Sequence, residues 1–378
     1  MALTRRRFVE ALGVAGASFL GSPVRAEQVG GSPAAPGSVQ PALDLIKLDQ
    51  NENPHSPGST VSKAVMEALT QGNRYPKNAG DLVTAIAKLH GVAGENILLG
   101  SGSGELLKAS VPAFVDSRRA LVAGLPTFET CTNTARSLGL PVREVAVDAS
   151  LRLDLPAMED AAGGAGLVFF CNPNNPTGTT WPTKEIEAMI DRLAQRSPET
   201  VVMVDEAYAH FVESKDYWSL APRAARDRRL IVTRTFSKVF GLAGLRIGYA
   251  VGHPDTIAAL KLTTTSGLLP VTSVAAALAA IGDESLIRDQ VQSNRAARTA
   301  ITKSFQNLGF KVFPSDTNFI LVDVQRKPED FRAACRERGV MVGRPFPGLP
   351  SHARISIGTL DEMQRAATVF KTVLAKTA

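Results

Sequence analysis

Residues 235–249 read TFSKVFGLAGLRIGY, and this stretch decides the fold predicted for the chain. The apolar run just before it, residues 230–232 (LIV), is typical of a buried strand. Lys238 therefore lies shortly beyond the end of that strand, on a turn. Gly241 and Gly244 allow the backbone to fold back closely there, because glycine has no Cβ.

The polar side chains of this turn suit one kind of ligand. Thr235 and Ser237 place two hydroxyl groups beside the Lys238 amine. Arg246 returns at the start of the next apolar run. An amine forms a Schiff base with an aldehyde, and hydroxyls with a guanidinium bind a phosphate dianion through charge-assisted hydrogen bonds. The turn therefore predicts a site for an aldehyde that also carries a phosphate.

Strand-like and helix-like patterns alternate from Asn96 onwards. The predicted strands are apolar runs at residues 97–99, 121–123, 143–147, 167–170, 201–204 and 230–232. Helical patterns between them include residues 128–138 and 183–194. This alternation indicates an α/β domain with a parallel sheet, in which active-site groups gather at the carboxyl ends of the strands.

Two of these strand ends carry groups suited to a charged ligand. The sequence GSGSG at residues 100–104 lies between a strand and a helix that is predicted to begin at Glu105. Because a helix N-terminus exposes unpaired N–H groups, Ser103 and Gly104 are predicted to bind a phosphate. Asp205 follows the fifth predicted strand, so its carboxylate is expected to face the crevice at the edge of the sheet.

The chain changes character after Gly252, where most patterns are helical. A long helix is predicted at residues 286–308, followed by strands at 311–313, 319–324 and 354–357 and by a final helix that Asp361 and Glu362 open. These elements predict a smaller α+β domain that also includes the N-terminal segment.

One arginine lies inside an otherwise apolar strand of this smaller domain. Arg354 is flanked by Ala353 and Ile355, and a buried guanidinium without a partner is costly. A structural salt bridge is one interpretation. A bidentate site for a substrate carboxylate is the other.

These motifs resemble the class I/II aminotransferases of fold type I, which use pyridoxal 5′-phosphate (PLP). The resemblance covers residues from about Leu48 to the C-terminus and is greatest for the histidinol-phosphate aminotransferase branch. It also includes residues 172–178 (NPNNPTG) and 205–208 (DEAY). It implies a large α/β domain with a mostly parallel seven-stranded sheet and a smaller α+β domain.

The resemblance also implies roles for individual residues. Lys238 and Tyr208 would be catalytic, together with Asp205, which would keep the pyridine nitrogen protonated. The other implied cofactor contacts are Tyr75, Ser103, Gly104, Phe128, Asn175, Ala207, Thr235, Ser237 and Arg246. The implied substrate contacts are Asn53, Asn318, Arg344 and Arg354. In the family, the tyrosine that matches Tyr75 reaches the PLP phosphate of the neighbouring subunit, which implies a homodimer.

The chain has 378 residues, which is enough for two domains with cores of their own. The predicted division is a signal peptide at 1–26, a flexible linker or N-terminal arm at 27–47, an N-terminal segment of the small domain at 48–80, a large PLP-binding domain at 81–285 and a C-terminal small domain at 286–378.

The N-terminus resembles a twin-arginine (Tat) signal peptide. Residues 4–9 (TRRRFV) precede a mildly apolar stretch at 11–20, and residues 24–26 (VRA) offer a cleavage site. These features predict export of the folded holoenzyme to the periplasm by the Tat translocase, with the cytoplasm as the alternative location.

Composition excludes other classes of protein. Hydrophobic residues make up 44% and charged residues 21%, which is typical of a soluble protein. Four arginines and one glutamate in residues 1–26 account for about half of the net charge of +6, so no nucleic-acid-binding surface is predicted. The three cysteines, Cys131, Cys171 and Cys335, lack metal-ligand spacing and predict buried free thiols, and no metal site is expected.

The predicted function is PLP-dependent transfer of an amino group between an L-amino acid, or the amino-acid part of an exported metabolite, and a 2-oxo acid, by a ping-pong mechanism. His55 and Ser56 stand where the resembled branch usually has an aromatic residue and a glycine, which weakens binding of a phosphate-bearing substrate, although Arg344 remains available. The alternatives are histidinol-phosphate transamination, a different PLP reaction such as decarboxylation or elimination, and a non-catalytic PLP sensor.

Overall fold

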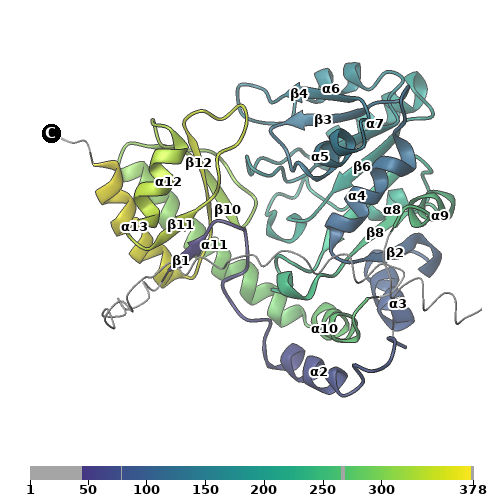
Figure 1. The fold of residues 1–378 in the computed structure, drawn as a ribbon, viewed down its shortest axis with the longest axis horizontal. Coiled ribbons are helices and arrows are strands. Elements are labelled where there is room, and N and C mark those ends of the chain that lie inside the picture. Colours follow the sequence, from purple (N-terminus) through teal and green to yellow (C-terminus); the bar gives the residue numbers. More distant parts are fainter. Residues whose placement is uncertain (1–44, 78, 265–268, 376–378) are drawn as a thin grey trace, which may run out of the picture. The chain divides into compact units, whose positions relative to one another are not determined.

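The computed structural model describes residues 45–77, 79–264 and 269–375, which belong to one compact unit (Figure 1). The predicted signal peptide at 1–26 lies outside the described residues, and so does the predicted linker up to residue 44.

A seven-stranded sheet is the largest element of the fold. Its strands lie in the order β2-β8-β7-β6-β5-β3-β4. All of them run parallel except β8, which is antiparallel to both of its neighbours, so the predicted mostly parallel sheet is confirmed. In chain order the strands are β2 (Ile97–Gly100), β3 (Leu121–Leu125), β4 (Val142–Ala146), β5 (Leu167–Cys171), β6 (Val201–Asp205), β7 (Leu230–Thr235) and β8 (Gly248–Gly252).

Strands β5 and β6 are apolar because both faces of the sheet are covered. Every residue of the two strands is buried. Phe170 and Val204 face one hydrophobic core, whereas Phe169 and Met203 face the other, as expected when successive side chains point to opposite faces. The only charged residue of β6 is Asp205, at its carboxyl end.

Helices form the two covering layers (Figure 1). One face packs against α4 (Ser103–Phe114), α5 (Thr130–Ser137) and α9 (Pro254–Lys261). The other face packs against α3 (Ala79–His90), α6 (Leu155–Ala161), α7 (Thr183–Arg196), α8 (Ala221–Ala224) and α10 (Val271–Ile281). Helix α2 (Ser59–Leu69) packs on α10. Short 3₁₀ turns lie at η1 (Gly94–Asn96), η2 (Ala209–Phe211) and η3 (Ala243–Leu245).

The C-terminal part has a separate core. An antiparallel sheet has the order β12-β10-β9, and β1 pairs in parallel with β11. Within the core that these strands share with three helices, the Phe370 ring stacks on that of Phe305 and packs at a tilt against that of Phe331. The elements are β1 (Ile46–Leu48), β9 (Lys311–Val312), β10 (Phe319–Asp323), β11 (Val340–Val342), β12 (His352–Ser356), α11 (Glu284–Asn307), α12 (Pro328–Arg336) and α13 (Leu360–Leu374).

The observed element boundaries differ from the predicted ones in two respects. Helix α5 begins at Thr130, so Phe128 precedes the helix instead of opening it. The predicted segment 48–80 contacts both parts of the fold, because β1 pairs with β11 while α2 packs on α10. The predicted domain boundaries after residues 80 and 285 fall inside α3 and α11, and they stay predictions.

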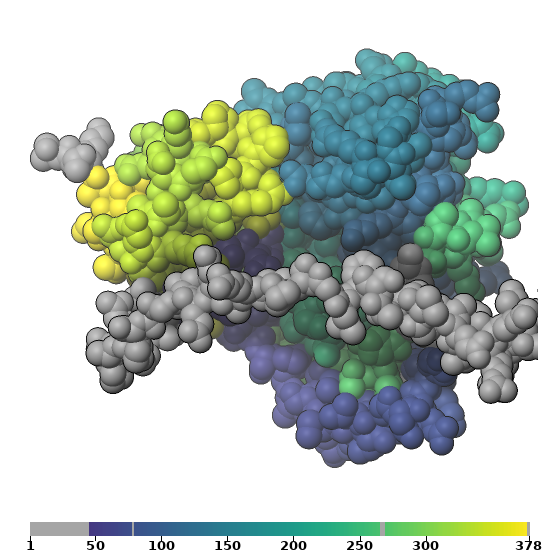
Figure 2. Space-filling view, in the orientation of Figure 1, coloured from purple at the N-terminus to yellow at the C-terminus, as the bar shows by residue number. Residues whose placement is uncertain are grey.

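The two parts of the fold meet along a seam. Leu151 packs there against Phe346 and Leu349, and Figure 2 shows yellow C-terminal residues adjoining blue ones. Cysteines 131, 171 and 335 are buried and free, as predicted. Within the described ranges, no helix has both the length and the apolar character that crossing a membrane requires.

Candidate active site

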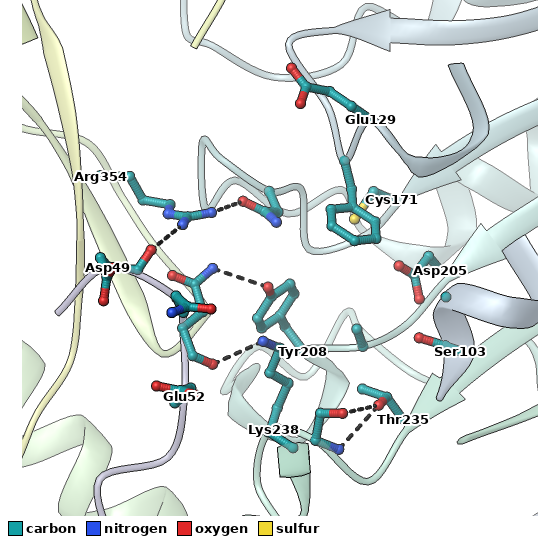
Figure 3. Close-up of a pocket in the computed structure, with 18 of the residues that line it drawn as sticks. Asp49, Glu52, Ser103, Glu129, Cys171, Asp205, Tyr208, Thr235, Lys238 and Arg354 are labelled. Carbon is teal, nitrogen blue, oxygen red and sulfur yellow. Dashed lines mark hydrogen bonds between the residues drawn. The ribbon is translucent and has the colours of Figure 1, made fainter. Parts of the chain in front are cut away.

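A cavity of about 640 Å³ opens at the carboxyl ends of β5, β6 and β7 (Figure 3). The residues predicted for the site that line this cavity are Ser103, Gly104, Phe128, Asn175, Asp205, Ala207, Tyr208, Thr235, Ser237, Lys238, Arg246, Arg344 and Arg354. Tyr75, Asn53 and Asn318 are not among its lining residues. The strand-end architecture therefore brings together most of the residues that the sequence singled out.

Lys238 projects its amine into the cavity. Its Nζ donates a hydrogen bond of 2.9 Å to the Asn51 carbonyl oxygen and lies 5.6 Å from the centre of the Tyr208 ring. Burial, together with the nearby Arg354 charge, lowers the pKa of the amine to about 8, although Glu52 acts in the opposite direction. A sizeable fraction of the amine is thus neutral in mildly alkaline solution, and only the neutral form can act as a nucleophile or a base.

Asp205 ends β6 and is only 2% exposed. Thr233 Oγ1 donates to its Oδ1 at 3.0 Å, and the Ala207 backbone N–H donates to the carboxylate as well. Burial raises the pKa of Asp205 to about 6, and these hydrogen bonds oppose the rise. The carboxylate is therefore ionised above about pH 6 and can stabilise a proton on a ring nitrogen within the cavity.

The start of α4 and the loop after β7 form one end of the cavity. Gly102 has a φ of +72° and lies so close to Arg246 that a Cβ would collide with the guanidinium. The Ser237 hydroxyl accepts hydrogen bonds from Thr235 Oγ1 at 2.9 Å and from Arg246 Nη1 at 3.5 Å. Together with the N–H groups that the helix N-terminus exposes at Ser103, these groups form a cradle for a dianion.

Arg354 reaches the cavity from β12 and is 8% exposed. Nη1 donates to Asn175 Oδ1 at 2.8 Å, Nη2 donates to the Asp49 carbonyl oxygen at 2.7 Å, and the buried Nε has no partner. Among the described residues, none places a carboxylate within ion-pair distance of this guanidinium, so the salt-bridge interpretation finds no partner there. Burial lowers the pKa of Arg354 to about 10, which is the direction expected for a buried cation that lacks an anionic partner.

Asn51 is central to the site but was not among the predicted site residues. It is 1% exposed and has a left-handed φ of +54°, a conformation that asparagine tolerates. Its Nδ2 donates to the Tyr208 hydroxyl at 3.2 Å, and its carbonyl accepts from Lys238. Its backbone N–H donates to Ser356 Oγ, which donates in turn to Asn51 Oδ1 at 2.9 Å. Asn51 thus joins β12 to Lys238.

Asn53 and Asn318 hold backbone behind the cavity. Asn53 Nδ2 donates to the carbonyls of Lys238 and Val239 at 3.2 and 3.1 Å. Asn318 Nδ2 donates to the carbonyls of Asn51 and Glu52 at 2.9 and 3.3 Å. Both side chains fix the loops that carry the reactive groups, and their implied contact with substrate stays a prediction.

Tyr75 lies apart from the other predicted cofactor contacts. Its side chain is 78% exposed, whereas Phe128 and Ala207 line the cavity. Tyr75 therefore does not contribute to the cavity of its own chain, and its implied contact with a neighbouring subunit's PLP stays a prediction.

The mouth of the cavity carries charges from both parts of the fold. Arg344, in the loop after β11, pairs with Glu129, which directly precedes α5. Arg332 of α12 also lines the cavity. Neither Glu129 nor Arg332 was predicted, because their positions in the sequence give no sign that they meet Arg344.

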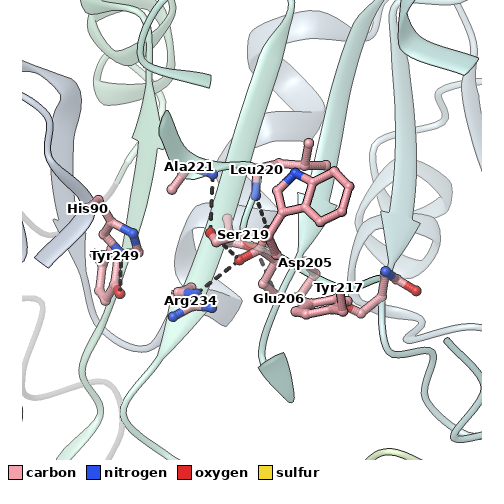
Figure 4. Close-up of polar contacts among 12 residues, drawn as sticks. His90, Asp205, Glu206, Tyr217, Ser219, Leu220, Ala221, Arg234 and Tyr249 are labelled. Carbon is pink, nitrogen blue, oxygen red and sulfur yellow. Dashed lines mark hydrogen bonds and ion pairs between the residues drawn. The ribbon is translucent and has the colours of Figure 1, made fainter. Parts of the chain in front are cut away.

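A buried ion pair lies beside Asp205 (Figure 4). Arg234 Nε donates to Glu206 Oε2 at 3.0 Å, and Glu206 also accepts from Ser219 Oγ and from the Leu220 N–H. Glu206 is 2% exposed, so its charge would be costly without these partners. Arg234 thus neutralises the Glu206 carboxylate, which directly follows Asp205 in the chain.

These features fit PLP. The cradle around Gly102 suits a phosphate, the Lys238 amine suits an aldehyde, and the buried Asp205 suits a protonated pyridine nitrogen. All three groups line one cavity of sufficient volume.

We predict that Gly102→Ala weakens PLP binding to the apo-protein by about tenfold or more, because its Cβ would displace the Arg246 guanidinium from the cradle, and the loss of one charge-assisted hydrogen bond costs about 1.5–3 kcal/mol. Titration of the apo-protein with PLP measures the dissociation constant. Gly104→Ala is the matched control, since a Cβ there meets no atom within 4 Å. Equal losses in the two variants would contradict the cradle.

We also predict that covalent uptake of PLP by the apo-protein, trapped with borohydride, becomes faster as the pH rises through about 8. The sign follows from the lowered pKa of Lys238, because the neutral, nucleophilic amine gains population above that value. The measurement is the uptake rate against pH. A midpoint near the ordinary value of 10.5 would show that the amine is not desolvated.

Comparison with known proteins identifies the family. Residues 44–370 match the family model Aminotransferase class I and II. The chain is 34% identical to the histidinol-phosphate aminotransferase of Symbiobacterium thermophilum, over 88% of this chain and 91% of that protein. It is 31% identical to the same enzyme of Bacillus subtilis, over 87% of this chain and 92% of that protein.

A solved structure supports the same assignment. The histidinol-phosphate aminotransferase of Sinorhizobium meliloti, in complex with pyridoxal-5′-phosphate, superposes with a TM-score of 0.82 at 27% identity, covering 88% of this chain and 92% of that one. The family match, together with a cavity that fits the cofactor, means that this chain belongs to the class I and II aminotransferases and is a PLP-dependent enzyme that transfers amino groups.

Proposed function

We propose that the chain transaminates a free L-amino acid, or the amino-acid part of a metabolite, whose carboxylate is bound by Arg354. The observation that carries this proposal is the buried Arg354 guanidinium, which faces the same cavity as Lys238. Among the described residues, its hydrogen-bond partners are an amide oxygen and a carbonyl oxygen. A guanidinium in this state gains most from a planar anion that accepts two hydrogen bonds.

The chain's own residues have distinct tasks in this proposal. Lys238 moves a proton from the substrate Cα, since its pKa of about 8 lets it both accept and return a proton near neutral pH. Asp205 stays ionised and holds the proton of the ring nitrogen. Tyr208 and Asn175 lie where their polar groups can fix the ring's orientation. When bound, PLP supplies an electron-withdrawing ring that stabilises negative charge at the substrate Cα.

The position of His55 supports a free amino acid over a phosphate-bearing donor. His55 Nε2 lies 2.8 Å from Ser293 Oγ, and the residue lines a separate small cavity. It is not among the residues that line the main cavity. The aromatic contact that the resembled branch offers to a substrate phosphate therefore has no counterpart from residue 55.

Histidinol phosphate remains the second candidate. The relatives that match most of the chain are named histidinol-phosphate aminotransferases. Arg344 and Arg354 both line the cavity and together offer two guanidiniums to a phosphate.

A half-reaction without acceptor tests the proposal. We predict that the holoenzyme, mixed with each of a panel of L-amino acids and with histidinol phosphate, releases one equivalent of an oxo product with its best donor and releases neither CO₂ nor ammonia. A 2-oxo acid should then restore turnover. Arg354→Lys should lower kcat/KM for the best amino acid by about 10- to 100-fold, as expected when a charged hydrogen-bonding pair worth about 1.5–3 kcal/mol is lost. A histidinol-phosphate rate far above every amino acid would overturn the preference, and release of CO₂ or ammonia would indicate a different PLP reaction.

We propose that Tyr75 completes the site of a second copy in a homodimer, because its side chain is exposed and lies outside the cavity of its own chain. Tyr75→Phe should raise the dissociation constant of PLP by about tenfold through loss of one charge-assisted hydrogen bond, while sedimentation still shows a dimer. A monomer that holds PLP as tightly as the dimer would refute the shared site.

We propose that residues 1–26 direct export of the folded holoenzyme through the Tat translocase, on the strength of the RRRFV sequence at residues 5–9. Replacing Arg5 and Arg6 with lysine should leave aminotransferase activity in the cytoplasmic fraction, whereas the unaltered chain should yield it in the periplasmic fraction. Unchanged periplasmic activity in the variant would contradict Tat dependence.

A further inference from the structure

The ion pair between Arg344 and Glu129 lines the same cavity as Lys238 and Arg354. Arg344 Nη2 donates to Glu129 Oε2, and Arg344 Nη1 donates to the Pro345 carbonyl oxygen at 3.0 Å. The two partners come from different parts of the fold, and both line the cavity that contains Lys238. Figure 3 shows Glu129 on the opposite side of this cavity from Glu52.

The ring of Phe346 lies next to both Arg344 of this ion pair and Arg354 of the proposed carboxylate site. The guanidinium carbon of Arg344 lies 4.4 Å from the centre of the Phe346 ring, and that of Arg354 lies 5.0 Å from the same centre. Phe346 is only 7% exposed, so packing fixes the ring on which both arginines rest. An amino acid held at Arg354 therefore has its side chain within reach of Arg344 and Glu129.

The two arginines have different partners in the protein without substrate. Arg354 has no carboxylate partner among the described residues, whereas Arg344 is paired with Glu129. A donor with a distal carboxylate or phosphate must either separate Arg344 from Glu129 or lie beside a like charge. A donor with a distal ammonium likewise lies beside the Arg344 charge, but it gains the Glu129 carboxylate as an acceptor, so the difference between the two kinds of donor depends on Glu129.

We infer that Glu129 is a specificity-determining residue, which disfavours donors with a distal anion and favours donors with a distal cation. This inference rests on the proposed function, because it assigns the α-carboxylate to Arg354. The side chains of Arg344 and Glu129 are 48% and 29% exposed, so solvent screens their charges and limits the effect to about three- to tenfold in kcat/KM.

Three donors of similar length test the inference. L-Glutamate, L-glutamine and L-ornithine carry a negative, a neutral and a positive distal group, and kcat/KM is measured for each with one common 2-oxo acid. Glu129→Gln should raise the glutamate-to-ornithine ratio of kcat/KM by about three- to tenfold, since it removes the charge and keeps an oxygen that can accept from Arg344. Glu129→Lys should raise this ratio further.

A matched control separates a local effect from a change in overall charge. Glu213→Gln removes a carboxylate that pairs with Arg295 and Arg298 and does not line the cavity, so it should leave the ratio unchanged. The inference would be overturned if Glu129→Gln left the glutamate-to-ornithine ratio of kcat/KM unchanged. This includes the case in which kcat/KM changes by one common factor for all three donors. If the unaltered enzyme transaminates no donor, the proposed function itself fails, and the two failures are thus distinguishable.

Discussion

The hydrogen bond from the Lys238 amine to the Asn51 carbonyl joins the loop after β7 to the segment that follows β1, and the geometry of the site depends on it. Asn51 is fixed on its other side by two hydrogen bonds with Ser356 of β12. The position of the amine therefore depends on β1 and β12, which belong to two different sheets. Asn318 donates to the same Asn51 carbonyl and Asn53 donates to the Lys238 carbonyl, so the backbone is held at both ends of this hydrogen bond.

The electrostatics of the cavity follow from this arrangement. Lys238 and Arg354 place two basic groups at one partly buried cavity, and the Arg354 charge adds to burial in lowering the pKa of the Lys238 amine. Asp205 supplies an anion at the opposite side, and Arg234 neutralises the adjoining Glu206. The cavity therefore carries positive charge where the phosphate of the cofactor and the α-carboxylate of the substrate are expected, which favours the binding of these two groups.

The sequence predicted the sheet and the strand-end groups because both depend on local patterns. Asp205 and Lys238 follow apolar runs, and parallel strands bring such ends to one edge. The role of Asn51 was not predictable in this way, because an asparagine before a proline-rich turn looks like an ordinary turn residue. Its importance arises from contacts with Tyr208, Lys238 and Ser356, which lie far away in the chain.

The other features that the sequence did not predict depend on partners that lie far away in the chain. Arg354 was recognised as a charge that needs a partner, but only the structure shows that its partners are an amide and a carbonyl instead of a carboxylate. Nothing in the sequence around Glu129 indicates its pairing with Arg344, which depends on how the two parts of the fold meet. Specificity at the mouth of the cavity is thus a property of the tertiary structure.

The central claim is that Lys238 is the residue that binds PLP covalently and moves the proton. The most direct measurement is peptide mapping of the holoenzyme after reduction with borohydride, carried out beside Lys238→Ala. The account predicts PLP on Lys238 alone, and neither covalent label nor turnover in the variant. A label on another lysine, or normal turnover in Lys238→Ala, would contradict it.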